Sequence, residues 1–149
     1  MINKLLITTV IFFAGLMTGF SQSEDLTVVI SGIKNQEGQI RIGVFSNADD
    51  FKVKEHPVDS AVVAVSNQQS VTYTFHKLPP GTYAIAVYHD ENNDGTLNKR
   101  QMGIPVEGIG FSNLTKSSRR PPDFEKVVFY LKEEPLTLEI PLFYNKKSH

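Results

Sequence analysis

The residues best suited to chemistry lie in one short segment, which reads YHDENNDGTLN from residue 88 to residue 98. Counted from Asp90, side chains that carry oxygen stand at positions one, three, five and nine, and glycine stands at six. EF-hand calcium loops begin with this spacing, because alternate residues of a tight turn point their oxygens at the cation. The segment therefore predicts a calcium site. Its expected ligands are Asp90, Asn92, Asp94, the Thr96 carbonyl and Asn98.

The calcium pattern is incomplete at its end. Position twelve is Gln101, where a complete loop has a bidentate glutamate, and the flanking residues do not read as helices. Glu107 or Asp123 could supply the missing carboxylate from further along the chain. Without that glutamate we expect a dissociation constant of roughly 10⁻⁴ to 10⁻³ M. A polar turn rich in Asn, Asp and Gly is the alternative, and the sequence leaves both open.

Two other classes of site use residues in or near this segment. Tyr88, Phe111 and Tyr144 could form a stacking platform, which predicts a module that binds carbohydrate or a small ligand. A hydrolase would use Asp90, Glu91 or Glu107, and its sign would be two carboxylates in one apolar cleft with one raised pKa. We expect a non-catalytic protein, with no residue assigned to catalysis. His89 and Asp90 are neighbours on a strand and point to opposite faces, so they would not converge on one substrate.

The first residues predict export. Lys4 precedes an apolar run from residue 5 to about residue 20, and small residues follow at Gly19 and Ser21. This pattern is typical of a secretory signal peptide, here residues 1–21, which leaves residues 22–149 as one domain. We expect a bacterial protein that is secreted or periplasmic, with no membrane attachment after cleavage.

The composition limits the partners. The formal net charge is −1 at pH 7, or about −2 without Lys4, so nothing in the charge favours nucleic acid. The chain has no cysteine, which excludes disulfides and thiolate metal sites. Its stability must therefore come from a hydrophobic core. The partner is expected to be a protein or a glycan of unknown identity.

Short alternating apolar runs position the candidate loop. Seven runs read as strands, with turn residues between them. They cover residues 26–33, 39–45, 61–65, 71–75, 82–88, 126–131 and 136–142. The first two are expected to form a hairpin across residues 35–38, and residues 47–55 could hold one helical turn. Ala84 and Ala86 share one face of their strand, which predicts close packing there.

These runs predict an all-β fold, a seven-stranded antiparallel β-sandwich of Ig-like or prealbumin-like type. Residues 98–125 match no regular element and form one long irregular loop. Such loops are uncommon in compact domains, and this one is too apolar to be disordered. We expect the metal loop, residues 90–98, to pin residues 103–124 to the sandwich.

Five sequence blocks resemble one known family. They are GQIRIGVF at 38–45, FHKLPPGTYAIAVYHD at 75–90, ENNDGTL at 91–97, MGIPVEGIGFSN at 102–113 and PPDF at 121–124. In this order the blocks resemble the DUF2141 family of exported bacterial proteins, whose function is uncharacterised. The stretch from Phe75 to Tyr83 also resembles part of transthyretin-like and carboxypeptidase-regulatory-like sandwiches. The first resemblance implies no activity, and the second implies a β-sandwich.

Overall fold

The computed structural model describes residues 23–117 and 120–145. The predicted signal peptide lies outside these residues. Within them, no helix has the length and apolar character needed to cross a membrane.

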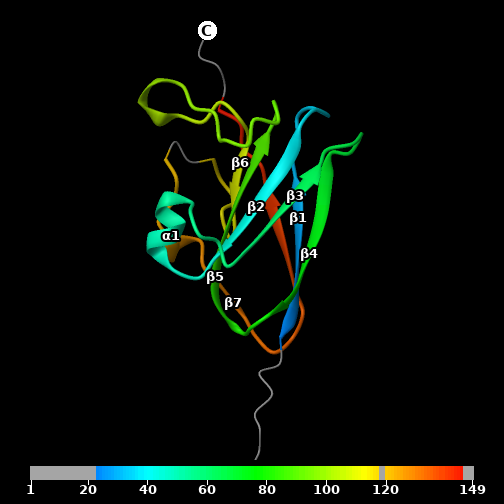
Figure 1. Cartoon of the computed structure of the whole chain (residues 1–149), viewed down its shortest axis with the longest axis vertical. Helices are drawn as coiled ribbons and strands as arrows, with labels where there is room; N and C mark the ends of the chain where they lie inside the picture. The colour runs from blue at the N-terminus through cyan, green and yellow to red at the C-terminus, as the bar shows by residue number, and fades with distance from the viewer. Residues whose placement is uncertain (1–22, 118–119, 146–149) are drawn as a thin grey trace, which may run out of the picture.

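The chain forms two facing β-sheets (Figure 1). The smaller sheet has the order β4–β1–β8, and the larger has the order β3–β2–β5–β6, with β7 also paired to β5. The strands are β1 Glu24–Ser31, β2 Gln39–Phe45, β3 Asp59–Ala64, β4 Ser70–Leu78, β5 Gly81–Asp90, β6 Ile109–Phe111, β7 Phe129–Leu131 and β8 Leu136–Pro141. The all-β sandwich is thus confirmed.

Alternation along the strands builds the core between the sheets. Every second residue of β1 and β2 is buried, as the sequence predicted, and the intervening residues face outward. The buried members of these strands include Leu26, Val28, Ile30, Ile40, Ile42 and Val44. Tyr83, Ile85 and Val87 of β5 join the same cluster. This core fixes which side chains of β2 and β5 point away from it.

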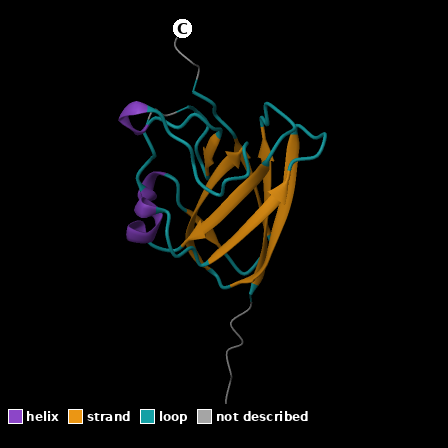
Figure 2. Ribbon diagram, turned by 45° about the horizontal axis from the view of Figure 1, so that its top comes forward, coloured by secondary structure: helices purple, strands orange, loops and turns teal. Residues whose placement is uncertain are grey.

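A second, smaller core covers the outer face of the larger sheet. Helix α1 (Ala48–Val53) and the 3₁₀ turn η2 (Phe124–Lys126) lie on this side (Figure 2). The Phe51 ring makes edge contacts with Phe45, Phe111 and Phe124 at centroid distances of 5.7, 6.0 and 5.7 Å. Ala84 is fully buried in this cluster, so the predicted close packing on the alanine face is confirmed.

The predicted hairpin of the first two strands is wrong. β1 pairs with β4 and β8, while β2 pairs with β3 and β5, so the first two strands belong to different sheets. The β1–β8 pair is also parallel, in a sandwich whose other strand pairs are antiparallel. Local turn residues could not reveal this, because β8 reaches β1 from more than a hundred positions away.

The long segment after residue 98 is less irregular than the sequence predicted. It contains the 3₁₀ turns η1 (Gln101–Gly103) and η2, and β6, which brings the described strands to eight. β6 pairs with Ala86, Val87 and Tyr88 of β5. A strand of three residues is too short to show alternation, which is why the apolar pattern did not reveal it.

Candidate ligand-binding groove and the adjoining loop

Asp90 ends β5 and is fully buried at the base of the loop. Its Oδ2 accepts hydrogen bonds from Arg41 Nε at 2.9 Å, Gln39 Nε2 at 3.0 Å and Gly95 N at 3.0 Å. Its Oδ1 accepts from Asp94 N at 3.1 Å. Burial opposes ionisation, but the bonds from Gln39, Arg41 and Gly95 outweigh it and hold the pKa of Asp90 below its usual value. Asp90 is therefore a carboxylate that organises the turn.

Side chains at loop positions three, five and nine converge at the loop tip, as the spacing predicted, and they are joined by the side chain of Thr96, whose carbonyl was the expected ligand. Asn92 Nδ2 lies 2.9 Å from Asp94 Oδ2 and 3.0 Å from Asn98 Oδ1. Asn98 Nδ2 and Thr96 Oγ1 each donate to Asp94 at 2.9 Å. These bonds, led by that of Asn98, hold the pKa of Asp94 well below its usual value.

Glu107 closes the loop from the long segment. Its Oε1 accepts from Glu91 N at 3.0 Å and its Oε2 accepts from Asn98 N at 2.8 Å. The residue is 4 % exposed. Glu107 therefore contacts the loop. Its carboxylate joins the long segment to the loop by accepting hydrogen bonds from the backbone N–H groups of Glu91 and Asn98.

The carboxylates of the predicted metal site already have protein partners. Both oxygens of Asp90 and both of Glu107 accept N–H groups, and Asp123 pairs with Lys126 at 2.9 Å on η2. Residues 23–117 and 120–145 contain no group of three or more His, Asp or Glu that could hold a metal ion. A cation would have to use the cluster at the loop tip, with its amides turned so that their oxygens face inward. Calcium binding stays a prediction.

Beside the loop, a groove of about 460 Å³ lies on the outer face of the larger sheet. Its floor consists of cross-strand neighbours in two rows. One row is Ser60, Gly43, Ala86 and Phe111, and the other is Val62, Arg41, Tyr88 and Ile109. Gly43 and Ala86 are direct neighbours, and the Phe45 ring lies against Gly43, 2.9 Å from where a Cβ would stand. The middle of the floor is therefore formed by the Ala86 methyl group and this ring.

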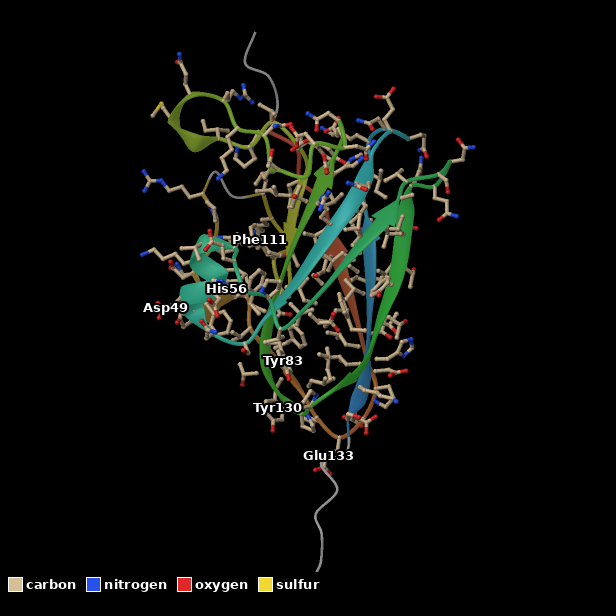
Figure 3. All side chains as sticks on the ribbon, in the orientation of Figure 1. Asp49, His56, Tyr83, Phe111, Tyr130 and Glu133 are labelled. Atoms are coloured by element: carbon tan, nitrogen blue, oxygen red, sulfur yellow. The ribbon has the colours of Figure 1, made fainter. Side chains whose placement is uncertain are left out.

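Two of the three predicted stacking residues line this groove. Tyr88 and Phe111 come from the adjacent strands β5 and β6, and Phe111 lies beside α1 (Figure 3). The Tyr88 hydroxyl donates to Gly95 O at 2.9 Å, which ties the groove to the loop. Val53 and Val62 also line it and are 59 % and 54 % exposed. Phe111 itself is 4 % exposed and packs in the second core, so the accessible apolar surface of the groove comes mainly from Val53 and Val62.

Three basic side chains border the groove. Arg41 is paired with Asp90, but neither Lys54 nor Lys99 lies within 4.0 Å of a carboxylate oxygen among the described residues. Lys54 Nζ lies over the Phe51 ring, 3.7 Å from its centroid, and donates to the Phe51 carbonyl. Burial of its ammonium end, aided by the charge of Lys99, lowers the pKa of Lys54 to about 8.

Tyr144, the third predicted stacking residue, lies elsewhere. Its hydroxyl is 2.8 Å from His89 Nδ1 and accepts from Lys34 N at 3.3 Å. His89 is fully buried, and its Nε2 lies 2.7 Å from Glu37 O. Because Glu37 O can only accept, Nε2 carries the proton and Nδ1 accepts from Tyr144. His89 and Tyr144 therefore form a structural link, separate from the groove.

The sequence did not indicate Gly43, Lys54 and Lys99 as groove residues. The one sequence pattern that pointed to this face was the pair Ala84 and Ala86, which indicated close packing there. Gly43 becomes part of the floor through its register with β5, and the two lysines meet the groove from α1's end and from the loop. Such pairings between distant segments leave no local pattern.

A family model described as "Uncharacterized protein conserved in bacteria (DUF2141)" matches residues 28–139. No curated protein and no solved structure matches the chain. The resemblance of residues 75–83 to transthyretin-like sandwiches gains no support from these comparisons.

Proposed function

The chain belongs to the DUF2141 family of uncharacterised bacterial proteins, and from that premise we propose that it is a non-catalytic module that binds a small apolar ligand. The observation that carries this proposal is the groove between α1 and the loop. Ligand sites are concave and mostly apolar, with volumes of roughly 300 to 1,000 Å³, and a few polar groups set the ligand's orientation. The groove, with Tyr88 and Phe111 on its floor and lysines at its border, fits that description.

The non-catalytic assignment is supported by how the candidate catalytic groups are used. Asp90 accepts four hydrogen bonds, and its pKa is lowered, whereas a general acid needs a raised one. Both ring nitrogens of buried His89 are engaged. These groups serve the fold, which leaves binding as the activity that the groove favours.

The proposed location is outside the cytoplasm of a bacterium, either secreted or periplasmic. The support is the sequence pattern of residues 1–21, together with a family found in bacteria. A ligand-binding module fits this location, because an exported protein meets small molecules from the surroundings.

A structural calcium site at the loop tip is a second proposal. The convergence of Asn92, Asp94 and Asn98 favours it, because these are alternate positions whose side chains the motif assigns to ligands. In this proposal the cation replaces the amide donors around Asp94 and stabilises the loop beside the groove. Its test is given in the Discussion.

Groove binding is tested with N-phenyl-1-naphthylamine, an uncharged probe that fluoresces in apolar sites. We expect saturable binding to the purified protein. Ala86→Leu should weaken it by about tenfold, since a leucine beside Gly43 fills the floor. Ala64→Leu is the matched control, because Ala64 is exposed on the same sheet and does not line the groove. Equal binding by both variants, or no binding by the unaltered protein, would refute the proposed function.

A further inference from the structure

We propose that the ligand of the groove is an amphipathic monocarboxylate, whose apolar body covers Ala86 and the Phe45 ring and whose carboxylate lies between Lys54 and Lys99. This inference rests on the proposed function and specifies its ligand. The class is that of a fatty acid, in which one anionic end follows an uncharged chain.

The apolar side chains that line the groove favour a ligand with an apolar body. Val53, Val62, Phe111 and the rings near them present carbon to the groove, and burying such surface from water yields about 25 cal/mol per Å². At the centre, an apolar chain would lie against the Ala86 methyl group and the Phe45 ring, which covers Gly43. The groove offers this apolar surface without a segment of the described chain to cover it.

The two lysines, Lys54 and Lys99, favour a negative charge at one end of the ligand. They line the same groove and have no carboxylate partner among residues 23–117 and 120–145. The Lys54 ammonium is held 3.7 Å above the Phe51 ring and 5.6 Å from the Phe111 centroid, at the border between the apolar surface and water. An anion placed there would relieve the repulsion between the two cations and would gain charge-assisted hydrogen bonds.

A carboxylate fits this border better than a phosphate ester. The arginine that lines the groove, Arg41, already bonds Asp90 through Nε, which leaves the two lysines to bind the anion. Lys54 already donates one N–H to the Phe51 carbonyl, which leaves fewer donors for the three free oxygens of a phosphate than for the two of a carboxylate. One negative charge between two point-like ammonium groups matches the site.

The test compares dodecanoate, dodecanol and dodecyl phosphate as competitors of the uncharged probe, each below its critical micelle concentration. We expect dodecanoate to compete about tenfold more tightly than dodecanol, the gain typical of a hydrogen bond to a charged group. Combining Lys54→Met with Lys99→Met should reduce this ratio to near one. Lys52→Met, an exposed lysine of α1 outside the groove, should keep the ratio.

The outcomes separate the two proposals. If the probe binds but dodecanoate and dodecanol compete equally, the carboxylate inference fails and the proposed function stands. Tighter competition by dodecyl phosphate than by dodecanoate would also overturn the inference, in favour of a phosphate ester. If the probe itself does not bind, the proposed function fails, and the inference fails with it.

Discussion

Lys54 is a cation held where its charge is poorly solvated. Its pKa is lowered to about 8, against 10.5 for an ordinary lysine, through burial and the charge of Lys99. Between these two values the unfolded chain keeps a proton that the folded protein has released. The free energy of unfolding therefore rises with pH through this window, and below pH 8 the folded state bears the full cost of the charge.

Lys54→Met should make the protein more stable than the unaltered protein at pH 7. The gain should fade as pH rises from about 8 to about 10.5, because neutral lysine no longer carries the cost. Urea denaturation at several pH values measures this. Lys52→Met, on the same helix, should follow the pH dependence of the unaltered protein. A Lys54→Met gain that is constant with pH would contradict the assignment of the lowered pKa.

Other titratable groups lie near Lys54. Lys99, Arg41 and Tyr88 line the same groove, and Arg41 is neutralised by Asp90. Asp50 of α1 lies 3.4 Å from His56, and on η2, which packs against α1, Asp123 and Lys126 pair with each other. Burial raises the pKa of Tyr88, so its titration also changes the stability at the alkaline end of the range. The difference between Lys54→Met and Lys52→Met therefore isolates the contribution of the Lys54 amine.

Single residues were predicted best where their contacts are local. The spacing from Asp90 to Asn98 predicted that alternate side chains converge, and they do. The spacing could not predict that Arg41 and Gln39 would donate hydrogen bonds to the Asp90 carboxylate. Both residues come from β2 and reach Asp90 through the pairing of β2 with β5. The partners of Tyr88 and Tyr144 were hidden for the same reason.

The loop of residues 90–98 is the element in which metal binding is to be tested. If calcium binds with a dissociation constant of roughly 1 mM, a concentration of roughly 10 mM should stabilise the protein by about 1.4 kcal/mol, or a few degrees in Tm. Chelator should reverse this shift, and Asp94→Asn should remove it, since Asp94 is the carboxylate at the loop tip. Calorimetric melting with calcium and with chelator measures the effect.

Asp49→Asn is the control for this experiment. Asp49 is an exposed acid in the first turn of α1, outside the loop, so its loss should leave the calcium response in place. Identical melting of the unaltered protein in calcium and in chelator would reject the calcium site. The loop would then be ordered by the hydrogen bonds of Asp90, Asp94 and Glu107 alone.

Most elements were predictable, but their pairing was not. Alternation located seven of the strands, and the helical turn near residue 50 was confirmed as α1, capped by Asn47 Oδ1 on Asp50 N at 2.9 Å. β6 escaped because three residues cannot display a period. The hairpin of β1 and β2 was predicted from the turn residues between them. The two strands instead lie in different sheets, and each pairs with other strands.

At the scale of the whole molecule, Gly110 of β6 marks a close approach to β8 of the other sheet. A Cβ there would lie 2.8 Å from Ile140 Cγ2 and 2.8 Å from the Pro141 carbonyl oxygen. Gly110→Ala should lower the free energy of unfolding by about 1 to 3 kcal/mol through overpacking. Gly81→Ala is the control, because its added carbon would meet the Tyr83 ring at an ordinary 3.5 Å. Urea titrations that show equal losses for both variants would count against this close approach.

The parallel pairing of β1 with β8 also has a temporal consequence. β1 is the middle strand of its sheet, so one of its edges stays open until residues 136–141 have been synthesised. The sandwich would therefore stay incomplete for almost the whole synthesis of the chain. Contacts between residues so distant in sequence also form slowly. Delayed closure of this kind leaves the smaller sheet incompletely paired until the last strand has been made.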